Sequence, residues 1–280
     1  MKKIIAAFDG LKFSESTLNY TLYIAKQTHA HLVGVFLDDL VYHTYGYKEI
    51  VSYEGGDLDN AVQEWNEKDR YKRDESVKVF EKACQNAGIN FSVHRNKNVA
   101  HQELVHESIY ADLLIINWKE TFIHSEEKIP STFLRDLLTD VQCPVLLVPD
   151  NYHPIEKLIF LYDGEPASVY AVKMFSYLLP VLKHLDTEVV SIKPEDLSLH
   201  LPDNRLMKEF MKRHFPKAEY HVFKGEAEEQ IVSFLRPRKD HFLVVLGAYR
   251  RGRVSRWFKP SMADSLMKFI KRPLFIAHNK

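Results

Sequence analysis

The segment GAYRRGRVSRWFKPS at residues 247–261 contains the residues best suited to hold a phosphate. It follows the apolar run FLVVL and precedes MADSLMKFI, so a buried strand is expected to lead through a loop with four arginines into a helix. Arginine binds phosphate through paired, charge-assisted hydrogen bonds, and the start of a helix favours an anion. The candidate anion-binding residues are therefore Gly247, Arg250, Arg251, Ser261 and, directly after them, Met262.

Fourteen histidines raise the question of a metal site. His101 and His106 are five residues apart, which is off the i,i+4 spacing that places two ligands on one helical face, and no third ligand accompanies His29 and His31. The sequence also has no serine-hydrolase, zinc-protease or Walker motif. We therefore assign no metal-binding or catalytic residue, and the interpretation leans towards binding rather than catalysis.

Composition limits the classes of partner. The 280 residues are 45% apolar, and 38 basic residues balance 38 acidic ones, so bulk charge gives no case for nucleic-acid or membrane binding. No apolar stretch approaches the length of a membrane span, and MKKIIAAFDG predicts a first strand rather than a signal peptide. Cys84 and Cys143 lack metal-ligand spacing. We expect a cytoplasmic protein with two reduced core thiols.

The chain repeats itself. The segment KKIIAAFDG begins at Lys2 and EKLIFLYDG begins at Glu156, which aligns Asp9 with Asp163. The halves also end alike, because Pro130–Ser131 matches Pro260–Ser261. This predicts two domains, 1–150 and 151–280, with a tyrosine-rich insertion at about 38–66 in the first.

The repeat unit predicts an α/β fold. Runs such as IIAAF, LVGVF and LLIIN are continuously apolar and alternate with helical segments, a pattern typical of parallel strands covered on both faces. Each half should be a Rossmann-like domain with an open five-stranded parallel sheet and helices on both faces. Ligands bind such sheets beyond the carboxyl ends of the strands, where Asp9, Asp163, Asn117 and Gly247 are expected to lie.

Three features together resemble the universal stress protein family in its tandem two-domain form. They are the opening KKIIAAFDG with the following SES, the stretch KGEAEEQIVSFL at 224–235, and the closing runs CPVLLVP and RPLFIAH. The resemblance implies an adenine nucleotide alpha hydrolase-like fold and a role in stress response through ligand or partner binding. It also implies that the two halves pair through their last strands as an intrachain pseudo-dimer. A homodimer and a protein partner of unknown identity are further expectations.

Nucleotide-binding members of that family carry Gly-x2-Gly-x9-Gly-Ser/Thr after the fourth strand. At this spacing the second half has Gly247, Arg250, Pro260 and Ser261, so two glycines are replaced. The first half has Asn117, Glu120, Pro130 and Ser131, so all three are replaced, and Glu120 places a negative charge where phosphate would lie. The second half is therefore the better candidate for ATP or AMP, and a basic loop that binds no nucleotide is the alternative.

The resemblance implies further contacts. The carboxylate after the first strand, Asp9 or Asp163, would touch the adenosine, although an Asp before Gly is equally explained as a turn residue. Backbone atoms of Phe36 or Ile192 would face adenine. The second-half set is Asp163, Ile192, Gly247, Arg250, Arg251, Ser261 and Met262, and the weaker first-half set is Asp9, Phe36, Asn117 and Ser131. A protein-interaction module that binds no nucleotide and, more weakly, a slow ATP hydrolase stay open.

The insertion contains aromatic residues that would form a lid or a partner surface, or would cover the sheet; they are Tyr42, Tyr45, Tyr47, Tyr53 and Trp65. A long amphipathic helix is predicted to follow over 66–88. Val77, Phe80, Ala83 and Cys84 should form its buried face, and Gly88 should end it.

Overall fold

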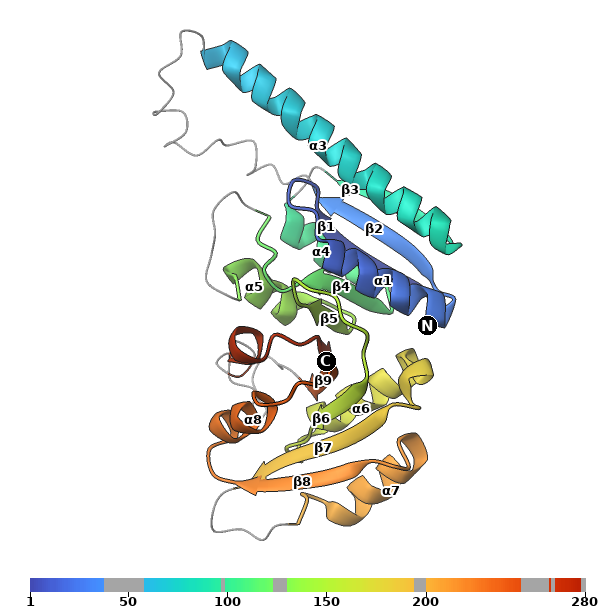
Figure 1. The fold of residues 1–280 in the computed structure, drawn as a ribbon, viewed down its shortest axis with the longest axis vertical. Coiled ribbons are helices and arrows are strands. Elements are labelled where there is room, and N and C mark those ends of the chain that lie inside the picture. Colours follow the sequence, from blue (N-terminus) through green and yellow to red (C-terminus); the bar gives the residue numbers. More distant parts are fainter. Residues whose placement is uncertain are drawn as a thin grey trace.

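The computed structural model describes residues 1–37, 58–96, 99–122, 130–193, 200–247, 262 and 265–277. Its core is one ten-stranded sheet in the order β3-β2-β1-β4-β5-β10-β9-β6-β7-β8, with helices on both faces (Figure 1). The predicted α/β class is thus confirmed. The strands are β1 (Lys3–Asp9), β2 (His31–Leu37), β3 (Phe91–Asn96), β4 (Leu113–Asn117), β5 (Val145–Val148), β6 (Lys157–Leu161), β7 (Asp186–Lys193), β8 (Glu219–Lys224), β9 (Phe242–Gly247) and β10 (Leu274–Ala277).

Each half has its own set of helices. In the first half these are α1 (Glu15–Thr28), α3 (Leu58–Ala87), α4 (Ala100–Ile109) and α5 (Thr132–Asp140). The second half has α6 (Pro166–Leu178), a 3-10 turn η2 (Pro180–Leu182), α7 (Asn204–His214), α8 (Ala227–Leu235) and the π-helical turn η3 (Leu266–Ile270). None of the helices within the described ranges combines the length and the apolar character needed to span a bilayer.

Alternation along the strands builds two cores. One face of β1 presents Ile5 and Ala7 to a cluster that is completed by α4, α5, α8 and η3. The other face presents Ile4, Ala6 and Phe8 to a cluster that is completed by α1, α3, α6 and α7. Because successive strand residues point to opposite faces, a strand with helices on both sides must be apolar throughout. This explains the continuous runs in the sequence.

The halves meet where β5 pairs with β10. This pairing is antiparallel, with Leu146 opposite Phe275, whereas every other strand pair in the sheet is parallel. The closing strands named by the family resemblance therefore do pair. Because β5 and β10 run in opposite directions, the carboxyl ends of the first-half strands lie at one edge of the sheet and those of the second half at the opposite edge. The division into domains 1–150 and 151–280 stays a prediction.

Helix α3 is longer than the sequence pattern predicts. It begins at Leu58 rather than near Asn66, so residues 58–66 of the expected insertion are helical and Trp65 belongs to a helix rather than a loop. Val77, Phe80 and Cys84 are buried as expected, Ala83 is partly buried, and Gly88 ends the helix with a φ of 65°. Tyr42, Tyr45, Tyr47 and Tyr53 lie outside the described residues.

Candidate functional site

The first-half site is built around Asp9, the last residue of β1. Asp9 is 1% exposed, and its Oδ1 accepts hydrogen bonds from the backbone N–H of Leu11 (2.8 Å) and Lys12 (3.3 Å). The carboxylate therefore forms the turn after the strand. Ser14 then begins α1 by accepting a hydrogen bond from the N–H of Thr17.

Polar groups that would face a phosphate in this half bond to one another. The Asn117 amide donates to Ser14 Oγ (3.3 Å), and its Oδ1 accepts from the N–H of Lys119 (2.8 Å). Ser131 caps α5 by accepting from the N–H of Leu134, and its hydroxyl donates to the carbonyl of Glu120 (2.8 Å). The bond between Ser131 and Glu120 therefore joins the start and the end of the loop that follows β4.

Glu120 occupies the place of the second glycine in the phosphate-binding pattern. It is 6% exposed, and burial raises the pKa of its carboxyl well above the usual range. The neighbouring charge of Asp9 raises the pKa further, while Lys12 and the N–H of Thr121 act in the opposite direction. A buried carboxyl beside Asp9 makes this edge electrostatically unfavourable for a phosphate.

Aromatic packing surrounds the place expected for adenine in the first half. Phe36, at the end of β2, is 5% exposed and stacks on Phe8 with ring centroids 5.2 Å apart. Phe13 stacks on Phe8 from the α1 side at 5.1 Å. The side chain of Phe36 is therefore a core residue.

In the second half, the described candidates also serve the fold. Asp163 is partly exposed, and its Oδ1 accepts from the N–H of Glu165 (3.0 Å), so it too forms a turn. Ile192 and Met262 are buried in one apolar core. Arg250, Arg251 and Ser261 lie outside the described residues.

Gly247 has a packing role that sequence reasoning missed. A Cβ at this position would lie 2.3 Å from the backbone carbon and oxygen of Ala167, in the first turn of α6. Helix α6 starts at Pro166, which aligns with Lys12, whereas α1 starts only at Glu15. The proline at the first helical position was the signal for this earlier start, because proline is favoured there. Because the first turn of α6 packs directly on Gly247, a larger residue at position 247 would clash with it.

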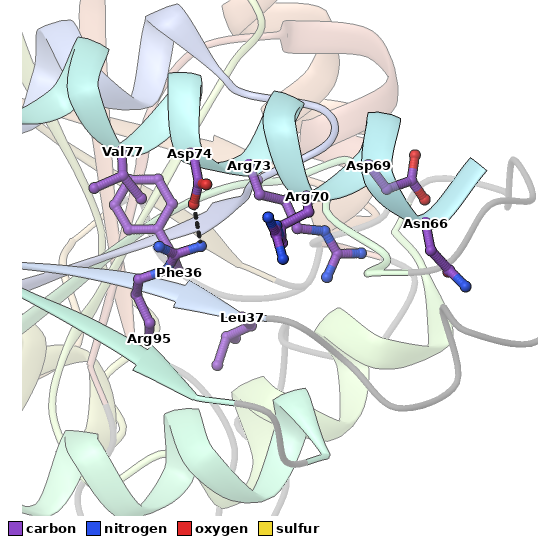
Figure 2. Close-up of a pocket in the computed structure, with 10 residues that line it drawn as sticks. Phe36, Leu37, Asn66, Asp69, Arg70, Arg73, Asp74, Val77 and Arg95 are labelled. Atoms are coloured by element: carbon purple, nitrogen blue, oxygen red, sulfur yellow. Dashed lines mark ion pairs between the residues drawn. The ribbon is translucent and has the colours of Figure 1, made fainter. Parts of the chain in front are cut away.

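Two cavities open beside these edges. The first, of about 520 Å3, lies between the ends of β2 and β3 and helix α3 (Figure 2). Its lining residues, which the sequence interpretation did not single out apart from Phe36 and Val77, are Gly10, Phe36, Leu37, Asn66, Asp69, Arg70, Arg73, Asp74, Val77 and Arg95. The second, of about 650 Å3, lies between α6 and α7 and is lined mainly by apolar side chains such as Val169, Leu206 and Phe210.

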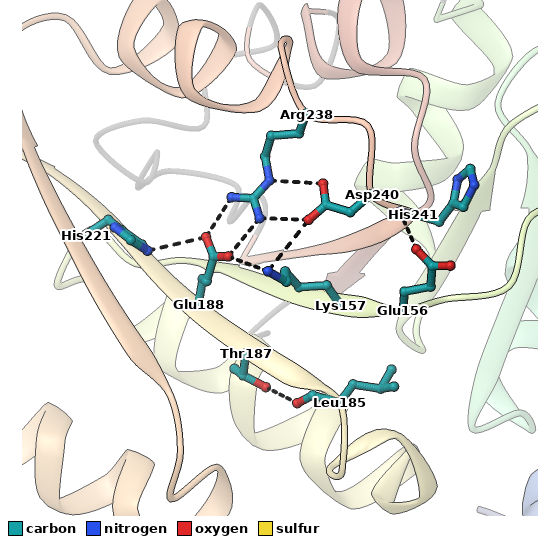
Figure 3. Close-up of polar contacts among 9 residues, drawn as sticks. All are labelled: Glu156, Lys157, Leu185, Thr187, Glu188, His221, Arg238, Asp240 and His241. Carbon is teal, nitrogen blue, oxygen red and sulfur yellow. Dashed lines mark hydrogen bonds and ion pairs between the residues drawn. The ribbon is translucent and has the colours of Figure 1, made fainter.

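An ionic cluster lies at the other edge of the second half-sheet, where its strands begin. Glu188 accepts two hydrogen bonds from Arg238, both of 2.7 Å, and a third from Lys157 at 3.1 Å (Figure 3). Asp240 accepts from the same guanidinium, and its side chain points to the centre of the cluster. This cluster joins the starts of β6, β7 and β9 and is distant from the candidate ligand edge. Within the described ranges, no three His, Cys, Asp or Glu side chains gather so as to hold a metal ion.

Comparison with known proteins places the fold. The chain is similar to a universal stress protein from Archaeoglobus fulgidus DSM 4304, with 14% identity, a TM-score of 0.71 and coverage of 99% of this chain and 98% of that one. It is also similar to a functionally unknown protein from Pseudomonas aeruginosa PAO1, with 12% identity, a TM-score of 0.61 and coverage of 99% and 92%. No protein-family model and no curated protein matches the sequence. The chain therefore has the tandem universal stress protein fold, as its residues predicted.

Proposed function

We propose that this protein acts in stress response as a cytoplasmic binding protein, and that it binds an adenine nucleotide, ATP or AMP, in its second half only. The observation that supports this proposal is the difference between the two equivalent edges. In the first half, Asn117 and the buried Glu120 stand where phosphate would lie. In the second half, Gly247 carries no side chain, and Arg250 and Arg251 follow it in the sequence.

Binding rather than turnover fits these edges. The described candidates are turn, cap and core residues, and none of them is placed as a general base. Cys84 and Cys143 are buried and form no disulfide, and burial raises the pKa of the Cys84 thiol to about 12, which suits a reduced compartment.

The test is titration of the full chain with ATP and with AMP by calorimetry, together with mass spectrometry of small molecules released on denaturation. Wild type should bind, and Arg250→Glu/Arg251→Glu should lose at least about tenfold in affinity because two charge-assisted contacts are reversed. The matched control is Lys119→Glu at the first-half edge, which should bind as wild type does. No heat and no released nucleotide would overturn the proposal.

A second candidate function is a protein-interaction module that binds no nucleotide. It is favoured by the role of Gly247, whose lack of a side chain is explained by the close approach of Ala167 alone. Replacement of the other two glycines by Arg250 and Pro260 points the same way. If calorimetry shows no nucleotide binding, this function takes its place.

A further inference from the structure

The first cavity exists because α3 is fixed at two points and then leaves the sheet. Ser76 Oγ donates to the carbonyl of Gly10 (2.7 Å), and a Cβ on Gly10 would lie 2.9 Å from Cγ of Arg73. Further along, a Cβ on Gly34 would lie 2.7 Å from the Phe80 ring. The N-terminal part of α3 extends beyond the sheet (Figure 1), and side chains of α3 line one side of the cavity.

Three arginines converge on this cavity from two elements. Arg70 and Arg73 point down from α3, and Arg95 reaches up from β3 (Figure 2). Arg73 is only 8% exposed, and its burial lowers the pKa of its guanidinium; Asp9 raises that pKa and Arg95 lowers it again. The positive charges of Arg73 and Arg95 therefore interact unfavourably, and an anion bound beside Arg95 would offset part of that interaction.

Carboxylates offset part of this charge. Asp74 Oδ1 lies 2.7 Å from a terminal nitrogen of Arg95, and Asp69 stands beside Arg70 in the lining. Asp9, outside the lining, offsets the charge of the buried Arg73, so Arg70 and Arg95 are the exposed cations that face the cavity. With three aspartates near three arginines, the cavity suits a ligand with no more than a single negative charge and disfavours a polyphosphate.

The remaining wall is apolar. The side chains of Phe36, Leu37 and Val77 line the cavity next to the sheet. The Phe36 ring stacks on Phe8, lies near-parallel to Phe13 and is 5% exposed, so it forms a rigid part of the cavity wall. Clefts of about 300–1,000 Å3 with an apolar wall and a few convergent polar groups are typical small-molecule sites.

We propose that this cavity binds a small aromatic or otherwise flat apolar monocarboxylate. The carboxylate lies between Arg70 and Arg95, and the apolar body lies on Phe36 and Val77. This site is separate from the nucleotide site proposed in the second half, and neither depends on the other.

The probe is 2-naphthoate, followed by its fluorescence anisotropy on titration with the full chain. Wild type should bind it saturably, and 2-naphthamide, which has the same ring system without charge, and acetate, which has the charge without the ring, should each bind at least about tenfold more weakly. Arg70→Gln/Arg95→Gln should weaken 2-naphthoate binding about tenfold or more. Both arginines are exposed, so the variant should keep the thermal midpoint of wild type.

Two controls separate this site from others. Arg205→Gln/Arg213→Gln removes two exposed arginines of α7 at the far end of the sheet and should leave the affinity unchanged. Arg250→Glu/Arg251→Glu, which tests the nucleotide proposal, should also bind 2-naphthoate normally. No saturable binding by wild type, equal binding of 2-naphthamide, or an unchanged Arg70→Gln/Arg95→Gln affinity would each overturn the inference.

Discussion

Glu107 and Glu188 have the same ionic role in the two halves of the molecule, but they reach it from different elements. Glu107, on α4, contacts Lys3 (3.3 Å) and His94 (2.5 Å). Glu188, on β7, contacts Lys157 (3.1 Å) and His221 (3.4 Å). The two lysines begin β1 and β6, and the two histidines hold matching register positions in β3 and β8.

Each of these glutamates is replaced by an apolar residue at the equivalent position of the other half. The first-half residue equivalent to Glu188 is Val33, by strand register, and the second-half residue equivalent to Glu107 is Phe234, by position in the helix. Each half therefore has one carboxylate between its Lys and its His, and the unused position is apolar. The shared element of the repeat is this charge arrangement rather than the identity of any one residue.

Glu188 should contribute more to stability than Glu107. Glu188 is more deeply buried, at 7% against 13% side-chain exposure, and it also pairs with Arg238. We expect Glu188→Gln to lower the free energy of unfolding by about 2–3 kcal/mol and Glu107→Gln to lower it by about 1 kcal/mol. Urea denaturation of the two variants tests this order, and an equal loss would contradict it.

Acid should weaken the same cluster. Burial alone would raise the pKa of Glu188, but hydrogen bonds from Arg238 and Lys157 lower it, and Arg238 also lowers the pKa of Asp240. A depressed folded-state pKa gives stability that is present above the unfolded-state value and is lost as the pH falls through the folded-state value. Wild type should therefore lose stability below about pH 4.5, and Glu188→Gln should lose less over that range when thermal midpoints are compared.

Glu120 should have the opposite pH dependence. Its raised pKa means that the folded state gains stability below the unfolded-state value and loses it as the pH rises through the folded-state value. Glu120→Gln keeps the shape without the charge, so at pH 8 it should stabilise the protein by about 1–3 kcal/mol. At pH 4 the difference from wild type should be small. A destabilised Glu120→Gln at pH 8 would show that the ionised carboxyl is satisfied in the fold.

Gly247→Ala should destabilise the protein whether or not nucleotide binds. The added Cβ would meet the Ala167 backbone, which can yield only by shifting α6. We expect a loss of about 1–3 kcal/mol in the free energy of unfolding, measured by denaturant melts without ligand. If Gly247→Ala has the same free energy of unfolding as wild type, α6 can shift to make room for the Cβ. The glycine would then be explained by its position facing a ligand rather than by packing.

Phe275 tests the seam between the halves. It is 0% exposed, lies opposite Leu146 and packs edge-on against Phe175 at 5.2 Å. Phe275→Ala should cost about 3–5 kcal/mol. Phe269→Ala, at a site 45% exposed, is the matched control and should change stability by less than about 0.5 kcal/mol.

Periodicity was enough to predict the fold. Continuous apolar runs fixed the parallel, doubly covered strands, and the alignment of Asp9 with Asp163 revealed the two halves. The length of α3 was underestimated, although Leu58, Ala61, Val62 and Trp65 follow one another at the i, i+3, i+4 and i+7 spacing of a helical face. This signal was missed because the segment was counted as part of the tyrosine-rich insertion.

The ligand-binding role of the candidate residues stays a prediction. Asp9, Asn117 and Ser131 were placed correctly at strand and helix ends, where their hydrogen bonds also serve the fold. The arginines of the first cavity were missed because Arg73 and Arg95 are 22 positions apart in the sequence. They line the same cavity only because α3 packs over β3. The spacing of two residues along the sequence does not indicate that a helix and a strand will bring them into one cavity.

The antiparallel seam has a consequence for assembly. In an open sheet, the strand whose backbone groups are unpaired on one side is the one that can add a neighbour from another molecule. Here the backbone groups of β5 and β10 are hydrogen-bonded to each other within a single chain, so neither strand can pair with a strand of a second copy. The outermost strands are β3 and β8, both of which carry charged residues, Arg95 on one and Glu219 and Lys224 on the other. Within the described part of the chain, a second copy that extended the sheet would have to pair with one of these charged strands.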